Sequence, residues 1–175
     1  MDTRFRIDLF AFALGALALL SAAFYNSRNG AAFVMCGLCV AGLVAARLAG
    51  FSNRALVPVA AGVVVLLWMV WIDPPASSQR TSALAHGAGG ALVGWALSEY
   101  LRGRISWPQW GIVALVAVFG VTVLWEIGEY AGDHLLTTDL QLNKTDSALD
   151  IFLGCFGGAT TVALAWLLAP RTARG

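Results

Sequence analysis

Apolar residues occur along this chain in long, nearly uninterrupted runs that short polar segments separate. Each run is close to the roughly 20 residues that a helix needs to cross a bilayer core of about 30 Å. The pattern predicts an all-α polytopic membrane protein, a single integral membrane domain over residues 1–175 that forms a bundle of six transmembrane helices. We expect the spans at approximately 9–25, 31–49, 55–72, 82–101, 111–131 and 147–168.

The first run leaves two interpretations open. It follows a short charged lead, and the small residues Ser21, Ala22 and Ala23 resemble the cleavage site of a signal peptide. Its length favours a first helix that is retained. Turn-forming residues follow it in the segment NSRNG at 26–30, as expected between two helices.

Basic residues are distributed unequally between the two predicted sides of the membrane. One side carries only Arg28, Arg80 and Lys144. Because cytoplasmic loops are enriched in Lys and Arg, the other side is predicted to be cytoplasmic, with both termini inside a bacterial-type inner (plasma) membrane. The basic residues on that side are Arg4, Arg6, Arg47, Arg54, Arg102, Arg104, Arg171 and Arg174.

Composition supports the membrane prediction and excludes one class of partner. The chain is 59% hydrophobic and 12% charged, whereas soluble domains carry about 25% charged residues. A net charge of +1 argues against binding to nucleic acid, since no basic patch could neutralise phosphates. Cys36, Cys39 and Cys155 all lie inside apolar runs, so we interpret them as small apolar residues and not as zinc ligands.

Six of the ten acidic residues lie in one stretch, 124–158. Glu126, Glu129, Tyr130 and Asp133 have the spacing i, i+3, i+4 and i+7, which predicts one stripe on a helix. Asp146 and Asp150 are one turn apart on the last run, and His86 is about one turn into the fourth run. We expect His86 and at least four of these carboxylates to converge at a similar depth below the outer surface.

Glycines follow two of these residues. Gly154 and either Gly157 or Gly158 lie on the same helix face as Asp150, and a second helix face lined by glycines follows His86. Small residues let helix backbones approach closely in membranes, so these faces predict tight packing near the site. The glycines after His86 are Gly87, Gly89, Gly90 and Gly94.

Ionisable groups inside apolar spans are costly and mark functional sites by default. Glu126 and Asp150 have no basic residue within a helical turn along the sequence, which favours function. Asp133 is more simply a solvated loop charge, Asp146 a helix N-cap, and His86 taken alone a core histidine. We hypothesise that His86, Glu126, Glu129 and Asp150 act as metal ligands or acid/base groups, with Asp146 as a further ligand.

Three functions fit these residues. A divalent metal ion, of identity left open among Mg, Mn, Fe and Zn, could support hydrolysis or transfer on a lipid or lipid-linked substrate. Alternatively, the carboxylates could form the relay of a proton- or cation-coupled carrier of small solutes. The third interpretation is a structural or partner-binding membrane protein without catalysis. The oligomeric state stays open.

Two segments resemble a known family. WEIGEY, from Trp125 to Tyr130, and DSALD, from Asp146 to Asp150, resemble the YjdF-like family of small bacterial inner-membrane proteins and, more distantly, VanZ-like membrane proteins. The glycine-bearing last run and His86-Gly87 fit the same pattern. The resemblance covers about 45 residues plus the histidine; the connector 133–145 departs from the pattern. It implies a shared site but no particular reaction.

Overall fold

The computed structural model describes Leu17 and residues 30–72, 79–106, 109–136 and 144–168, and within these ranges the chain is all-helical apart from its turns. The expected all-α fold is therefore confirmed for this part of the chain. The predicted span at 9–25 lies outside the described residues, with the exception of Leu17. The helices are α2 (Gly30–Leu48), α3 (Asn53–Ile72), α4 (Gln79–Leu101), α5 (Gln109–Leu136) and α6 (Lys144–Leu167).

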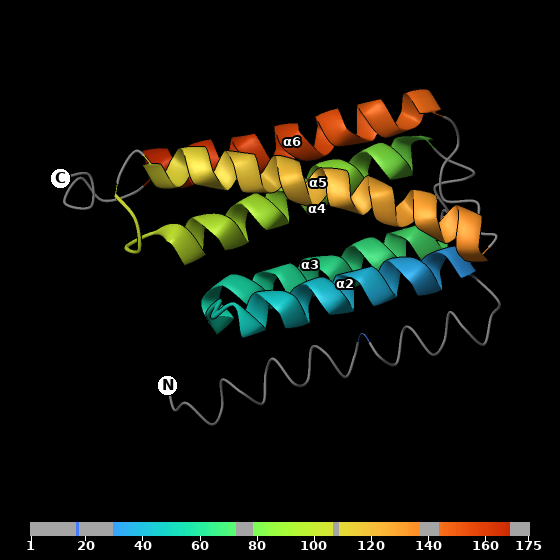
Figure 1. The fold of residues 1–175 in the computed structure, drawn as a ribbon, viewed down its shortest axis with the longest axis horizontal. Coiled ribbons are helices and arrows are strands. Elements are labelled where there is room, and N and C mark those ends of the chain that lie inside the picture. Colours follow the sequence, from blue (N-terminus) through green and yellow to red (C-terminus); the bar gives the residue numbers. More distant parts are fainter. Residues whose placement is uncertain (1–16, 18–29, 73–78, 107–108, 137–143, 169–175) are drawn as a thin grey trace.

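The helices lie side by side and alternate in direction, so that α2, α4 and α6 run one way and α3 and α5 run the other (Figure 1). Helix α4 packs against α3, α5 and α6, and its most extensive contact is with α6. Helix α2 packs against α3 and α5. The short connections between the apolar runs thus produce an up-and-down bundle, as expected for antiparallel neighbours.

Helices α4 and α6 approach at backbone distance through glycines. A methyl group at Gly90 would overlap the carbonyl of Gly154, and one at Gly157 would overlap the carbonyl of Gly87. A Cβ at Gly94 would lie 2.6 Å from the carbonyl oxygen of Gly158. The predicted small-residue packing is confirmed at these positions. Gly89 differs, because a Cβ built there meets no atom of the described chain within 4 Å.

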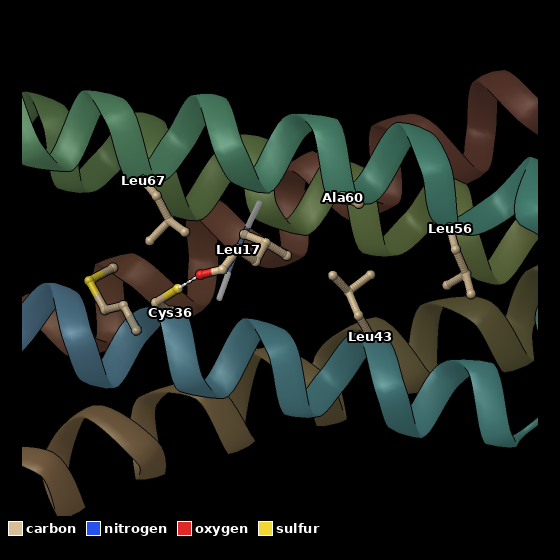
Figure 2. Packing of buried hydrophobic residues seen from close by; sticks show 7 residues of the cluster. Leu17, Cys36, Leu43, Leu56, Ala60 and Leu67 are labelled. Carbon is tan, nitrogen blue, oxygen red and sulfur yellow. Dashed lines mark hydrogen bonds between the residues drawn. The ribbon is translucent and has the colours of Figure 1, made fainter. Parts of the chain in front are cut away.

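The space between α2 and α3 is filled by apolar side chains, and Leu17 packs among them (Figure 2). The Sγ atom of Cys36 lies in this cluster and donates to the carbonyl oxygen of Leu17 at 3.2 Å. Cys36 therefore packs as a small core residue, as its apolar surroundings in the sequence indicated. The buried members are Leu17, Met35, Cys36, Leu43, Leu56, Ala60 and Leu67.

Large apolar side chains also cover the outside of the bundle. On α5, for example, Val116 is 66% exposed and Phe119 is 55% exposed. Two helical segments, Gln109–Leu135 and Ser147–Leu167, are long and apolar enough to cross a membrane, and the apolar helices Phe33–Leu48 and Asn53–Met69 are shorter. The buried core is mostly apolar, but it also contains polar residues such as Ser82, Thr122 and Asp150.

The two ends of the bundle carry opposite charges. Arg47, Arg54, Arg102 and Arg104 lie where α2 and α4 end and α3 begins, and we call this the arginine end (on the left in Figure 1). Of the other arginines, Arg80 is described; it lies at the start of α4, at the opposite end. That opposite end also holds the late part of α5 and the start of α6, and we call it the acidic end.

Two element boundaries change the interpretation of acidic residues. Helix α5 continues to Leu136, so Asp133 is helical and half-buried and is not a loop residue. Helix α6 begins at Lys144, so Asp146 is within its first turn and is not the N-cap that precedes the helix. The sequence pattern assigns the polar ends of α5 and α6 to the connector between them. A helix end that lies in water or at the membrane interface has no apolar periodicity by which it could be recognised.

Candidate functional site

Three helices bring four ionisable side chains together at the acidic end. His86 comes from the second turn of α4, Glu126 and Glu129 from the second half of α5, and Asp150 from the second turn of α6. At 1.5 Å per residue, His86 and Asp150 lie about 10 Å from the ends of their helices. The cluster is therefore inside the bundle and not on its rim.

The imidazole of His86 lies between the carboxylates. Its Nδ1 atom is 3.6 Å from Oε1 of Glu126. On the other side of the ring, Nε2 is 3.5 Å from Oδ2 of Asp150 and 4.0 Å from Oε1 of Glu129. One histidine thus contacts three carboxylates, each supplied by a neighbouring helix.

All three carboxylates are buried. Glu126 is 5% exposed, Glu129 is 4% exposed and Asp150 is 5% exposed, and the His86 side chain is 9% exposed. Carboxylates packed this closely in a low-dielectric interior cannot all be ionised unless a cation or shared protons compensate their charge. One imidazole can carry at most one positive charge, so the site is suited to an additional cation or to protons.

Backbone packing explains why His86 and Asp150 meet. Gly90 follows His86 by four residues, and Gly154 follows Asp150 by four, so each glycine is on the same helix face as its ionisable residue. The close approach at Gly90 and Gly154 draws the two faces together one turn away from the site. A bulkier residue at Gly90 would separate the imidazole from the carboxylate, whereas a Cβ at Gly154 would meet the Thr122 side chain of α5.

Two further side chains hold the carboxylates in place. Nε1 of Trp125 donates a hydrogen bond to Oε1 of Glu129 at 2.7 Å. The hydroxyl of Ser82 lies 3.4 Å from both Oδ1 and Oδ2 of Asp150. Sequence reasoning did not assign either residue to the site. The signals were present, because Ser82 is four residues before His86 and Trp125 four before Glu129, spacings that place each pair on one helix face.

The remaining predicted residues have different positions. Tyr130 leaves the expected stripe: it is 53% exposed, and its ring packs on His134 with centroids 4.0 Å apart. Asp133 is half-buried one turn beyond Glu129. The backbone of Asp146 is in α6 one turn before Asp150, while its side chain lies outside the described residues. The structure therefore joins His86 with three carboxylates, and the expected fourth is not among those described.

The cluster has the dimensions of a metal site. His86, Glu126 and Asp150 each offer a ligand atom, and these atoms all lie within 4.8 Å of one another, so the group could hold a metal ion. Ligands of a tetrahedral ion with bonds of 2.0–2.1 Å are roughly 3.4 Å apart. The 3.5 Å from Nε2 to Asp150 and the 3.6 Å from Nδ1 to Glu126 are of this size, each for one ring nitrogen with one carboxylate.

The two ring nitrogens of His86 can take different roles. In metal sites the histidine nitrogen that does not bind the ion usually donates a hydrogen bond to a carboxylate or carbonyl. Here both nitrogens face carboxylates, so either one can bind an ion while the other is oriented by its own acidic partner.

Comparisons of this chain with protein-family models, with curated proteins and with solved structures find no match.

Proposed function

We propose that this protein is a multi-pass membrane protein that binds a divalent metal ion at the buried cluster of His86, Glu126 and Asp150, with Glu129 beside it. In this proposal six helices cross the membrane, both termini are cytoplasmic, and the cluster opens toward the outer side. The resemblance to the YjdF-like family fits such a protein.

The membrane location is supported by the distribution of apolar surface. The outward-facing side chains of α5 and α6 are largely aliphatic and aromatic, which would be unfavourable in water but is matched by lipid tails. The polar groups that a bilayer would exclude are inside the bundle instead, among them Ser82, Thr122 and the three carboxylates.

The observation that carries the metal proposal is the convergence of one imidazole and two carboxylates from α4, α5 and α6 on ligand atoms within 4.8 Å. A mixed nitrogen and oxygen ligand set suits Zn, Mn or Fe. A divalent ion there would supply Lewis-acid chemistry, which fits hydrolysis or transfer on a lipid or lipid-linked substrate reaching the site from the membrane.

Metal analysis of the detergent-purified protein tests the proposal. Wild type should carry about one metal ion per chain, because one imidazole can serve one ion, and His86→Ala and Asp150→Asn should lose it. Glu99→Gln is the matched control: its carboxylate is also on α4 and largely buried, but it pairs with arginines at the arginine end. Metal-free wild-type protein after reconstitution with Zn, Mn or Fe would overturn the proposal.

A second function is favoured by one specific contact pattern. Because the imidazole faces carboxylates through both nitrogens, it can accept a proton on one side and release it on the other, as in proton-coupled carriers. This alternative predicts no tightly bound metal and a proton flux in vesicles that Asp150→Asn abolishes. Flux that persists in Asp150→Asn and His86→Ala would exclude it.

A further inference from the structure

The arginine end contains a second, independent arrangement of charged and aromatic side chains. The turn between α2 and α3 and the turn after α4 lie against each other there. The rings of Phe51 and Tyr100 are stacked, with centroids 4.0 Å apart and planes 7° apart. The Tyr100 hydroxyl donates to the carbonyl oxygen of Ala49 at 3.0 Å, so the two turns are fastened by a stack and a hydrogen bond.

Arginines are built into this contact. The Arg104 guanidinium lies 4.1 Å above the Tyr100 ring, and it also donates to the carbonyl oxygens of Tyr100 and Gly50. Arg102 is fixed between the carbonyl oxygen of Ala165, at 3.4 Å, and Glu99, at 3.3 Å. These contacts use only some of the five N–H donors of each guanidinium; the Arg104 side chain is exposed, while Nε of Arg102 is buried.

The charge at this end is strongly positive. Four arginines face a single acidic residue, Glu99, among the residues that the structure describes here. Arg54 approaches Glu99 at 3.9 Å but is 86% exposed, so the pair neutralises little of its field. The described residues of this end therefore carry three net positive charges, and Arg47 and Arg104 are positioned by hydrogen bonds to the carbonyl oxygens of Phe51 and Gly50.

Exposed apolar side chains border the arginines. Leu48 precedes the α2–α3 turn and is 84% exposed, Leu168 follows α6 and is 80% exposed, and Ile105 beside Arg104 is 37% exposed. Cationic groups next to exposed apolar side chains match a molecule with an anionic head and apolar tails. A soluble phosphate would satisfy the arginines but would leave this apolar border in water.

We propose that the arginine end, through Arg54, Arg102 and Arg104, is a binding site for the headgroup phosphate of an anionic phospholipid, with its acyl chains along Leu48 and Leu168. Arginine pairs with phosphate through parallel N–H donors, and basic clusters at the ends of membrane helices attract anionic lipids. The site shares only the bilayer location with the proposed function and does not depend on metal binding at the acidic end.

Native mass spectrometry of the full chain tests this site with two lipids of identical acyl chains, phosphatidylglycerol and phosphatidylcholine. At about 1 kcal/mol for each arginine, the wild type should prefer phosphatidylglycerol by roughly fivefold per arginine engaged. Arg54→Gln with Arg104→Gln should bring the two lipids close to equal. Arg80→Gln, which removes one exposed arginine at the opposite end, should retain the preference.

Several outcomes would overturn the site. Equal retention of the two lipids by wild type would do so. A loss of the phosphatidylglycerol preference in Arg80→Gln as large as that in Arg54→Gln with Arg104→Gln would also do so. Displacement of phosphatidylglycerol by millimolar glycerol phosphate would show a simple anion site instead. Because Arg104 also packs on Tyr100, the single variant Arg54→Gln serves as a second test, since its side chain is 86% exposed and pairs with Glu99 at 3.9 Å. Metal content should be unchanged throughout.

Discussion

The two ends of the bundle use ionisable residues in opposite ways. At the acidic end, three buried carboxylates lie 3.5–4.0 Å from the nitrogens of one histidine, and the four residues come from three helices. At the arginine end, the Arg104 guanidinium lies over the Tyr100 ring, Arg47 and Arg102 donate to backbone carbonyl oxygens, and Arg54 is 86% exposed. Buried groups share a low-dielectric space, so each one changes the charge of the others, whereas exposed groups are screened by water and ions.

The two ends should therefore respond differently to helix displacement and to ionic strength. Interactions at the acidic end should depend on the exact separation of α4, α5 and α6 and little on ionic strength. Interactions at the arginine end should weaken with added salt, because a Debye length of about 8 Å at physiological ionic strength screens exposed charges. Substitutions that move a helix should therefore disable the acidic end first.

The largest effect is expected at Gly90. Gly90→Ala places a methyl group on the Gly154 carbonyl, so α4 and α6 must separate and His86 must leave Asp150. We expect a loss of about 3 kcal/mol in the free energy of unfolding, at the upper end of overpacking costs, and loss of the bound metal. Thermal unfolding in detergent measures the first and metal analysis the second.

Gly89→Ala is the matched control, one residue away on the same helix. Its Cβ meets no described atom within 4 Å, so it should leave both readouts unchanged or slightly raise the stability through a better helix propensity. Equal destabilisation by the two substitutions would contradict the close helix approach.

An intermediate effect is expected at Trp125. Trp125→Phe keeps an aromatic ring but removes the Nε1–H that holds Glu129. Groups that orient metal ligands typically contribute 10- to 100-fold in metal affinity, and we expect about 10-fold weaker binding because Glu129 is the more distant carboxylate. Competition with a chelator measures it.

Trp95→Phe provides the comparison for this variant. Nε1 of Trp95 is buried and makes no hydrogen bond within the described part of the chain. Its removal should leave metal affinity as in wild type, and a loss of affinity equal to that of Trp125→Phe would argue against a specific role of the Trp125–Glu129 bond.

The smallest effect is expected at Tyr100, at the arginine end. Tyr100→Leu removes the stack on Phe51 and the support of Arg104, which should cost about 1 kcal/mol of unfolding free energy. Metal content should not change. Tyr130→Leu, at a half-exposed tyrosine of the acidic end, should alter stability by less than about 0.5 kcal/mol. A loss of metal in Tyr100→Leu would show that the two ends are coupled.

Much of the fold can be predicted from the sequence, because an apolar run of membrane length satisfies its backbone hydrogen bonds by forming a helix. The five described helices begin and end within a few residues of the runs at 31–49, 55–72, 82–101, 111–131 and 147–168, except that α5 extends five residues farther to Leu136. The choice of His86, Glu126, Glu129 and Asp150 as candidates came from their position inside apolar runs. Tyr130 was assigned to the wrong face, because i+4 spacing fixes a neighbourhood on a helix and not the direction of one side chain.

The sequence by itself determined that the chain forms apolar helices, that its acids gather late in the chain, and that Arg47, Arg54, Arg102 and Arg104 follow or precede apolar runs on one predicted side. These properties depend on residue type and spacing along a single helix. The tertiary structure alone decided that His86 lies between Glu126 and Asp150, that Ser82 contacts Asp150, and that Tyr100 holds two turns together. Such contacts join residues up to 68 positions apart, and they depend on how closely the glycine faces of α4 and α6 approach, a distance that no local pattern specifies.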